Sequence, residues 1–215
     1  MTVTTPIRQI QLQPGSVVTI SGISWQAFEA ILQEMGEKRS TRLAYFQGTL
    51  ELMSPLPQHE RAIVIISDLV KLLLRRQKRP WESLRSTTFK QQGIAGIEPD
   101  DCFYIQNYQA VIGKDRLDLT VDPPPDLAIE SDLTSKTEVE AYLALKVPEL
   151  WVYGAGTLTI NVLRGNEYVE TPTSLTFPDL PIAEMIPKVI ERAKKIGTSP
   201  ALLEVEDWLD QQARL

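Results

Sequence analysis

The segment from Asp126 to Asp132 constrains the fold most, because it combines the clearest buried β-strand of the chain with acidic side chains. It follows the run DPPP, which cannot be helical inside and therefore marks a loop. Side chains alternate between the two faces of a strand. One face is predicted to carry Asp126, Ala128, Glu130 and Asp132, and the other Leu127, Ile129 and Ser131. Two carboxylates two positions apart at the end of a buried strand are costly unless they are paired or bound to a cation.

The periodicity of the first part of the chain predicts an α/β fold, in the form of a mixed α+β sheet flanked by helices. Residues 24–35 are predicted to form a helix with Ser24 as its N-cap. Residues 43–53 are predicted to form a hairpin with its turn at Gln47 and Gly48. A longer helix is predicted from the SPLPQHE cluster to Arg76. The chain contains no glycine-rich phosphate loop of the Rossmann or P-loop type, which excludes those folds.

The rest of the chain is predicted to alternate between strands and helices. Strands are predicted in 81–90, 101–105, 126–133, 148–153, 158–163 and 166–169, and helices in 134–145, 181–195 and 200–212. These elements are expected to form one domain over residues 1–215, in which 1–20 is an irregular N-terminal arm and 182–215 is a C-terminal helical extension.

The composition is that of a soluble globular protein, and 215 residues are enough to bury a core without disulfide bonds. Cys102 is the single cysteine and is expected to be a buried apolar residue, which favours a reducing cytoplasm. No apolar run is long enough to span a membrane, and the N-terminus does not resemble a signal peptide. The formal net charge of −6 argues against a non-specific nucleic-acid coat protein but permits an enzyme with an acidic metal site and a local basic patch.

A second acidic element, the pair Pro99-Asp100, lies directly before a short apolar strand. If this strand lies next to residues 126–132, Asp100 would come close to Glu130 and Asp132. The three carboxylates would then offer hard oxygen ligands, which suit Mg²⁺ or Mn²⁺. The alternative is that these acids are solvated at strand ends, with Asp132 capping the following helix.

Four motifs in a fixed order carry a family resemblance: GTLELMSPLPQHE, EPDDCFYI, PPDLAIESDLTSKTEVEAY and VPELWVY. Through them, residues 20–185 resemble the putative restriction endonuclease family of the Uma type, in the PD-(D/E)XK nuclease superfamily. The resemblance implies a restriction-endonuclease-like fold, in which helices flank a core sheet. It also implies a site that cleaves phosphodiester bonds with the help of Mg²⁺ or Mn²⁺.

The resemblance assigns roles to individual residues. Asp100 matches the aspartate that follows proline in the motif, and Glu130 matches the acidic residue of the (D/E)XK element. The lysine expected two residues later is Asp132 in this chain, and Lys136 on the next predicted helix is the nearest candidate for that role. Lys136 is therefore predicted to be catalytic, and the alternative is a solvated lysine in the first turn of a surface helix.

Glu51 and His59 match two further polar positions of the family. Glu51 lies on the opposite strand face from Leu50 and Leu52, where it would complete the metal shell or position a water, or else be a surface charge. His59 is in register with the apolar stripe of the long helix, which points it inward. It is predicted to position substrate or water, and the alternative is a hydrogen-bonded structural histidine.

A basic segment ends the long predicted helix and consists of Lys71, Arg75, Arg76, Lys78 and Arg79. Four of these cations are predicted to contact nucleic-acid phosphates: Arg75, Arg76, Lys78 and Arg79. Contacts with phosphates supply most of the non-specific affinity for nucleic acid. The alternative is that they complement the negative end of the helix dipole.

The sequence thus predicts a Mg²⁺-dependent endonuclease that hydrolyses DNA in the cytoplasm, with a homodimer as one arrangement. Asp132 in the lysine position and the acidic net charge support an alternative, a catalytically weakened nuclease fold that binds nucleic acid or serves in assembly. A third interpretation is a metal-dependent hydrolase of a small phosphorylated substrate.

Overall fold

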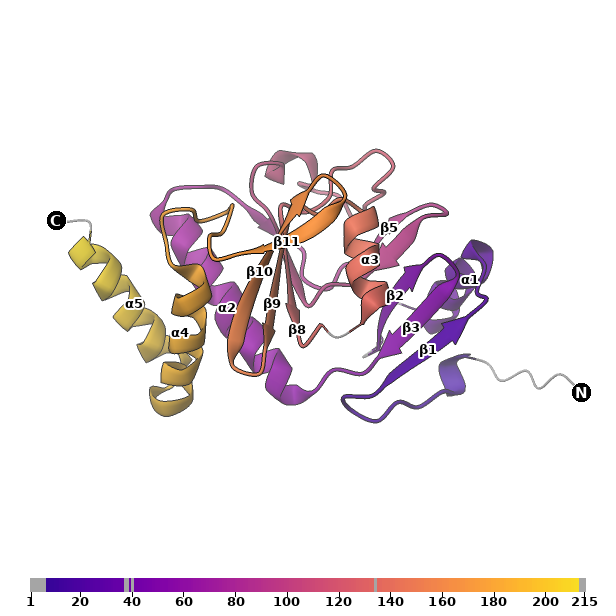
Figure 1. Ribbon diagram of the computed structural model, residues 1–215, viewed down its shortest axis with the longest axis horizontal. Coiled ribbons are helices and arrows are strands. Elements are labelled where there is room, and N and C mark those ends of the chain that lie inside the picture. The colour runs from indigo at the N-terminus through magenta and orange to yellow at the C-terminus, as the bar shows by residue number, and fades with distance from the viewer. Residues whose placement is uncertain (1–6, 37–38, 40, 134, 213–215) are drawn as a thin grey trace, which may run out of the picture.

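The computed structural model describes residues 7–36, 39, 41–133 and 135–212, apart from the side chains of Arg8 and of residues 57–59. These residues form two β-sheets, one of five strands and one of six, with helices around and between them (Figure 1). The predicted α/β fold class is confirmed, but the strands are divided between two sheets where a single sheet was expected.

The smaller sheet is antiparallel throughout. Its strands, in spatial order, are β1 (Val17–Ser21), β3 (Thr49–Met53), β2 (Arg42–Phe46), β6 (Ala95–Ile97) and β5 (Phe89–Gln91). One face is covered by α1 (Trp25–Met35), whose Phe28 is fully buried against Leu50 and Leu52. The other face turns toward the larger sheet, so the outward side chains of β2 and β3 are available to a site between the sheets.

Local sequence signals explain the start of this sheet. The Ser24 hydroxyl accepts a hydrogen bond from the backbone N–H of Ala27 at 3.1 Å, which confirms the predicted helix cap. Gln47 and Gly48 have φ angles of 44° and 83°, as a tight hairpin turn requires. The prediction of an irregular arm over residues 1–20 is wrong from Val17 onward, because β1 pairs with β3; residues 1–6 lie outside the described part of the chain.

The larger sheet is mixed. Its strands, in spatial order, are β11 (Glu167–Thr171), β10 (Thr157–Arg164), β9 (Glu149–Gly154), β8 (Leu127–Ser131), β7 (Asp101–Tyr104) and β4 (Glu82–Ser83). Strands β8 and β9 are parallel, and α3 (Lys136–Ala144) lies in the crossover that joins them, as a parallel pair requires. Two short 3₁₀-helices, Ile7–Gln9 and Tyr108–Ala110, complete the elements.

Helices cover the larger sheet on both faces. On one face, α2 (Pro57–Arg76) and α4 (Ile182–Ile196) enclose the largest apolar cluster, and α5 (Thr198–Gln212) packs on α4 (Figure 1). On the other face, α3 lies between the two sheets, where its Tyr142 shares a buried cluster with Ala44 of β2 and Ala128 of β8. Within the described residues, none of the helices is both long and apolar enough to cross a lipid bilayer.

The side chains of β8 alternate as predicted. Leu127 and Ile129 pack toward α2 and α4, whereas Ala128 packs toward α3. The strand ends at Ser131, since Asp132 takes a left-handed backbone conformation with φ of 52°. Alternation therefore places Glu130 on the α3 side of the sheet, facing the junction of the two sheets.

Candidate active site

A pair of buried carboxylates lies where the chain passes from the smaller sheet to the larger one. Asp100 directly precedes β7 and Glu130 is near the end of β8. These two strands are antiparallel with Asp101 opposite Ile129, so the register brings Asp100 beside Glu130. The backbone N–H of Asp100 donates to Oε2 of Glu130 at 3.3 Å, and the two residues are only 4% and 2% exposed. The structure thus brings together the two acids that the sequence predicted.

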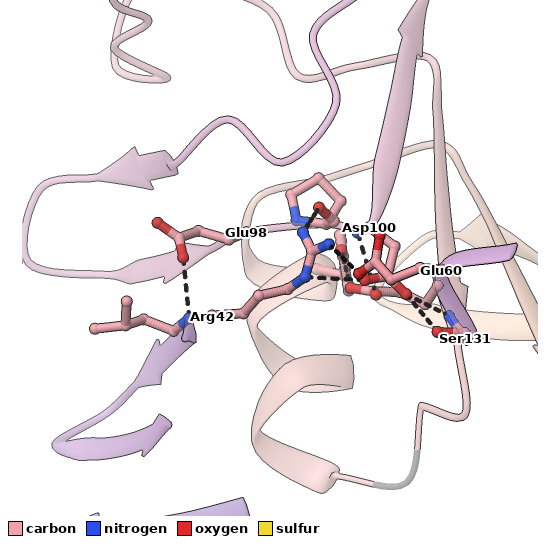
Figure 2. Close-up of polar contacts among 9 residues, drawn as sticks. Arg42, Glu60, Glu98, Asp100 and Ser131 are labelled. Carbon is pink, nitrogen blue, oxygen red and sulfur yellow. Dashed lines mark hydrogen bonds and ion pairs between the residues drawn. The ribbon is translucent and has the colours of Figure 1, made fainter. Parts of the chain in front are cut away.

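Asp100 is held on both of its carboxylate oxygens (Figure 2). Oδ2 accepts hydrogen bonds from the backbone N–H of Ser131 at 2.8 Å and from its hydroxyl at 2.6 Å. Oδ1 lies 3.0 Å from Nε of Arg42. The two hydrogen bonds from Ser131 and the ion pair with Arg42 fix the orientation of the Asp100 carboxylate.

The surroundings of Glu130 disfavour its ionised form. The hydroxyl of Tyr142 donates to its Oε1. Burial raises the pKa of Glu130 well above its ordinary value, and the neighbouring charges of Asp100 and Glu138 raise it further. A carboxylate in such surroundings needs either a proton or a nearby cation.

Two further carboxylates belong to the same group of charges: Glu138 interacts with Asp100 and Glu130, and Glu51 interacts with Glu138. Glu51 on β3 is 7% exposed, and its Oε2 accepts a hydrogen bond from the hydroxyl of Ser135. On α3, burial and the charges of Glu51 and Asp100 raise the pKa of Glu138 to about 7. Glu51 was predicted for this place, whereas Glu138 was missed. Its signal in the sequence is its position four residues before Tyr142, which places both on one helix face.

Arg42 brings a positively charged side chain to the site, and this residue was not predicted from the sequence. Besides its contact with Asp100, it donates from Nη1 to the carbonyl of Pro99 at 2.9 Å and from Nη2 to Oε1 of Glu60 at 3.3 Å (Figure 2). Burial acts to lower its pKa, but the charges of Asp100, Glu130 and Glu60 outweigh burial and raise it. A sequence signal exists, because strand alternation puts Arg42 on the same face of the hairpin as Glu51.

Lys136 and Asp132 lie toward solvent. The Lys136 side chain is 88% exposed, and its ammonium lies 3.4 Å from Oε1 of Glu140. Asp132 is exposed and its Oδ1 lies over Gly154, where an added Cβ would come within 2.5 Å of it. The helix cap is Ser135, whose hydroxyl accepts from the N–H of Glu138 at 3.3 Å, and not Asp132. The predicted catalytic role of Lys136 and metal-binding role of Asp132 stay predictions.

His59 lies in α2, but its side chain is outside the described part of the structure, so its predicted role in positioning substrate or water stays a prediction. The basic segment lies at the opposite end of this helix. Glu60 and Arg76 are separated by roughly 24 Å along the helix axis, from the rise of 1.5 Å per residue.

Two members of the basic segment make contacts within the molecule. Arg76 pairs with Asp210 of α5, and Arg79 donates to the carbonyl of Thr176 at 2.5 Å with its guanidinium 5.7 Å from the centre of the Phe177 ring. Arg75 and Lys78 are exposed. The predicted contact of this segment with nucleic acid stays a prediction.

The chemistry of the donors fits a hard divalent cation. Among the residues that the structure describes, no group of three or more His, Cys, Asp or Glu side chains is arranged as a ready-made metal site. Mg²⁺, however, is usually held by one or two carboxylates together with waters and substrate phosphates, not by a complete protein cage. Asp100 and Glu130 supply such a pair, and the pKa of Glu130 is raised by burial first and then by the charges of Asp100 and Glu138, both of which a bound cation would offset.

Comparisons with known proteins identify a family and a similar fold. The family model Uma2, described as "Putative restriction endonuclease", matches residues 25–193. The fold is similar to that of a solved protein, a putative nuclease belonging to DUF820 from Anabaena variabilis ATCC 29413. The two chains are 16% identical, the match covers 75% of this chain and 92% of the other, and the TM-score is 0.50, so this likeness concerns the fold alone. None of the curated proteins matches the chain. The predicted restriction-endonuclease-like fold is confirmed.

Proposed function

The chain belongs to the Uma2 family, described as putative restriction endonucleases, and from this premise we propose that it is a Mg²⁺-dependent endonuclease that hydrolyses phosphodiester bonds in DNA. Family and fold support a nuclease. The dependence on Mg²⁺ or Mn²⁺ and the choice of DNA are the proposed part. The observation that carries the proposal is the buried pair of Asp100 and Glu130, joined by a 3.3 Å hydrogen bond, with the carboxylate of Glu138 close enough to interact with both.

Each residue of the site has a distinct task in this reaction. Asp100 and Glu130 would hold the metal ion, with Ser131 fixing one oxygen of Asp100 and Tyr142 fixing one oxygen of Glu130. A bound divalent ion polarises the scissile phosphate and lowers the pKa of a water molecule. Glu138 is suited to accept the proton of the attacking water at its carboxylate, because its pKa of about 7 matches a neutral operating pH.

One observation favours a second candidate, a catalytically weakened nuclease fold that binds nucleic acid or serves in assembly. The lysine position of the family motif is occupied by Asp132, and the nearest lysine on α3, Lys136, is 88% exposed and paired with Glu140. A site that lacks its charge-stabilising lysine keeps its capacity for binding but loses part of its rate.

The direct test is cleavage of plasmid DNA by the purified protein with Mg²⁺ or Mn²⁺, with Mn²⁺ binding measured by calorimetry. We expect the wild type to cut and to bind the ion, and Asp100→Asn to lose both. Glu140→Gln, a half-exposed carboxylate on α3 outside the pair, is the matched control and should keep both. Absence of cutting and of metal binding in the wild type would refute the proposal. Binding of DNA without cutting, in the wild type and in Asp100→Asn alike, would favour the second candidate.

A further inference from the structure

The guanidinium of Arg42 contacts Asp100 of the carboxylate pair, and Arg42 also lines a surface groove. Two of its nitrogens face buried groups that cannot move far: Nε is 3.0 Å from Oδ1 of Asp100, and Nη1 donates to the carbonyl of Pro99 at 2.9 Å. The third nitrogen, Nη2, points toward Glu60, and both Arg42 and Glu60 line the groove. The guanidinium is therefore fixed on its inner side and presents its outer side to the groove.

Glu60 is the weakest of these partners. Its side chain is 42% exposed, compared with 5% for Asp100, and its Oε1 is 3.3 Å from Nη2. An ion pair with so exposed a partner contributes little, because water screens it and the side chain loses rotamer freedom. Glu60 can therefore leave Arg42 at small cost, whereas the contacts to Pro99 and Asp100 keep the guanidinium in place.

We propose that Arg42 binds a phosphate group of the nucleic-acid substrate through Nη2, and that Glu60 occupies this position when no substrate is bound. The inference rests on the proposed function. Carboxylates and phosphates present similar acceptor oxygens to the planar fork of an arginine, so one replaces the other without movement of Arg42. A phosphate bound to Nη2 of Arg42 would lie close to Asp100. Arg42 would then supply the positive charge at the site, since Lys136 is exposed to solvent.

Arg39 resembles Arg42 in position and exposure but differs in its carboxylate partner. It lines the same groove, and its side chain has the same exposure as that of Arg42, 13%. Its carboxylate partner, however, is Glu98, which is only 5% exposed and also accepts from the backbone N–H of Leu43 at 3.0 Å. Arg39 is thus engaged by a buried carboxylate that a ligand cannot easily displace, and it serves as the matched control.

The experiment measures the affinity of a fluorescein-labelled DNA duplex by anisotropy in Ca²⁺ buffer. Glu60→Gln is expected to tighten binding by about threefold to fivefold, the range that loss of a weak competing ion pair allows. Arg42→Lys keeps the charge but loses the fork and is expected to weaken binding at least ~10-fold. Glu60→Gln added to Arg42→Lys should have no effect, because the two side chains act on one interaction. Arg39→Lys should stay within about twofold of the wild type.

Unchanged affinity in Glu60→Gln, an equal gain in the Arg42→Lys background, or no binding by the wild type would overturn the inference. A wild type that binds the duplex but does not cut it with Mg²⁺ or Mn²⁺ refutes the proposed function, while the Glu60→Gln result still tests the inference. A wild type that cuts while Glu60→Gln is neutral refutes the inference alone. Thermal unfolding identifies any variant with a damaged fold, and the exposed Glu60→Gln is expected to fold normally.

Discussion

Replacing Glu138 with glutamine is expected to stabilise the metal-free protein at pH 8 but not at pH 4.5. Burial, followed by the charges of Glu51 and Asp100, raises the pKa of Glu138 to about 7 in the folded protein. Between its ordinary pKa and this value, the folded state keeps a proton that the unfolded state has released. Stability therefore falls as the pH rises through this window, and above it the folded protein carries the full cost of a buried charge.

The size of the effect follows from the two pKa values. The pKa rises from 4.5 to about 7, and each pH unit in between corresponds to about 1.4 kcal/mol. The cost of ionising Glu138 in the folded state is therefore on the order of 3 kcal/mol at pH 8, and glutamine removes it. For a domain of this size, such a gain corresponds to a rise of roughly 6–12 °C in the unfolding temperature.

The assay is thermal and urea unfolding followed by circular dichroism in EDTA, at pH 4.5 and pH 8, for the wild type and Glu138→Gln. Glu140→Gln, on the same helix but half-exposed and paired with Lys136, is the control that should change little at either pH. The reasoning is wrong if the difference between Glu138→Gln and the wild type is the same at both pH values, because a difference without pH dependence does not come from a titrating carboxyl group.

Three further predictions concern the metal, the packing of α1 on the smaller sheet and the core of the larger sheet. Mn²⁺ in excess should raise the unfolding temperature of the wild type at pH 8 and leave that of Asp100→Asn unchanged, since only a ligand that binds the folded state stabilises it; scanning calorimetry measures this. Gly96→Ala should lose about 1–3 kcal/mol in urea titrations, because its Cβ would lie 2.6 Å from Cζ of Phe28. Glu149→Ala should lose at least ~1 kcal/mol in unfolding followed by tryptophan fluorescence, since the buried Glu149 accepts from Nε1 of Trp151 at 2.7 Å and from the hydroxyl of Thr176 at 2.6 Å; a smaller loss would contradict this account.

Strand alternation explains why much of the site could be predicted from the sequence. Glu51 and Glu130 each lie on a strand whose flanking residues are buried on the opposite face, so their direction follows from a period of two. Asp100 was found through its position directly before an apolar strand and through the family motif. Local periodicity was sufficient here because each of these residues lies on, or next to, one regular strand.

Other features of the site depend on geometry that a local sequence pattern does not contain. Arg42 and Pro99 are 57 positions apart, and only the chain's passage between the two sheets brings them together. Asp132 follows the strand pattern in sequence, but its left-handed backbone ends the strand. Lys136 and Glu138 occupy the same turn of α3, and the rotation of that helix between the sheets decides which of them faces the other carboxylates and which faces solvent.

The carboxylates of the site come from both sheets and from the helix between them, which links the assembly of the fold to the charge of the site. Glu51 belongs to the smaller sheet, Glu130 to the larger one and Glu138 to α3. Packing the sheets around α3 therefore brings like charges together, and this repulsion opposes the burial of apolar side chains in the same junction. Arg42 offsets part of it through Asp100, and protonation of Glu130 or Glu138, or binding of a divalent cation, offsets more of it. The carboxylates gathered around the proposed metal position thus make the metal-free junction less stable when they are ionised, so metal binding should be strongest under the pH conditions that destabilise the metal-free fold most.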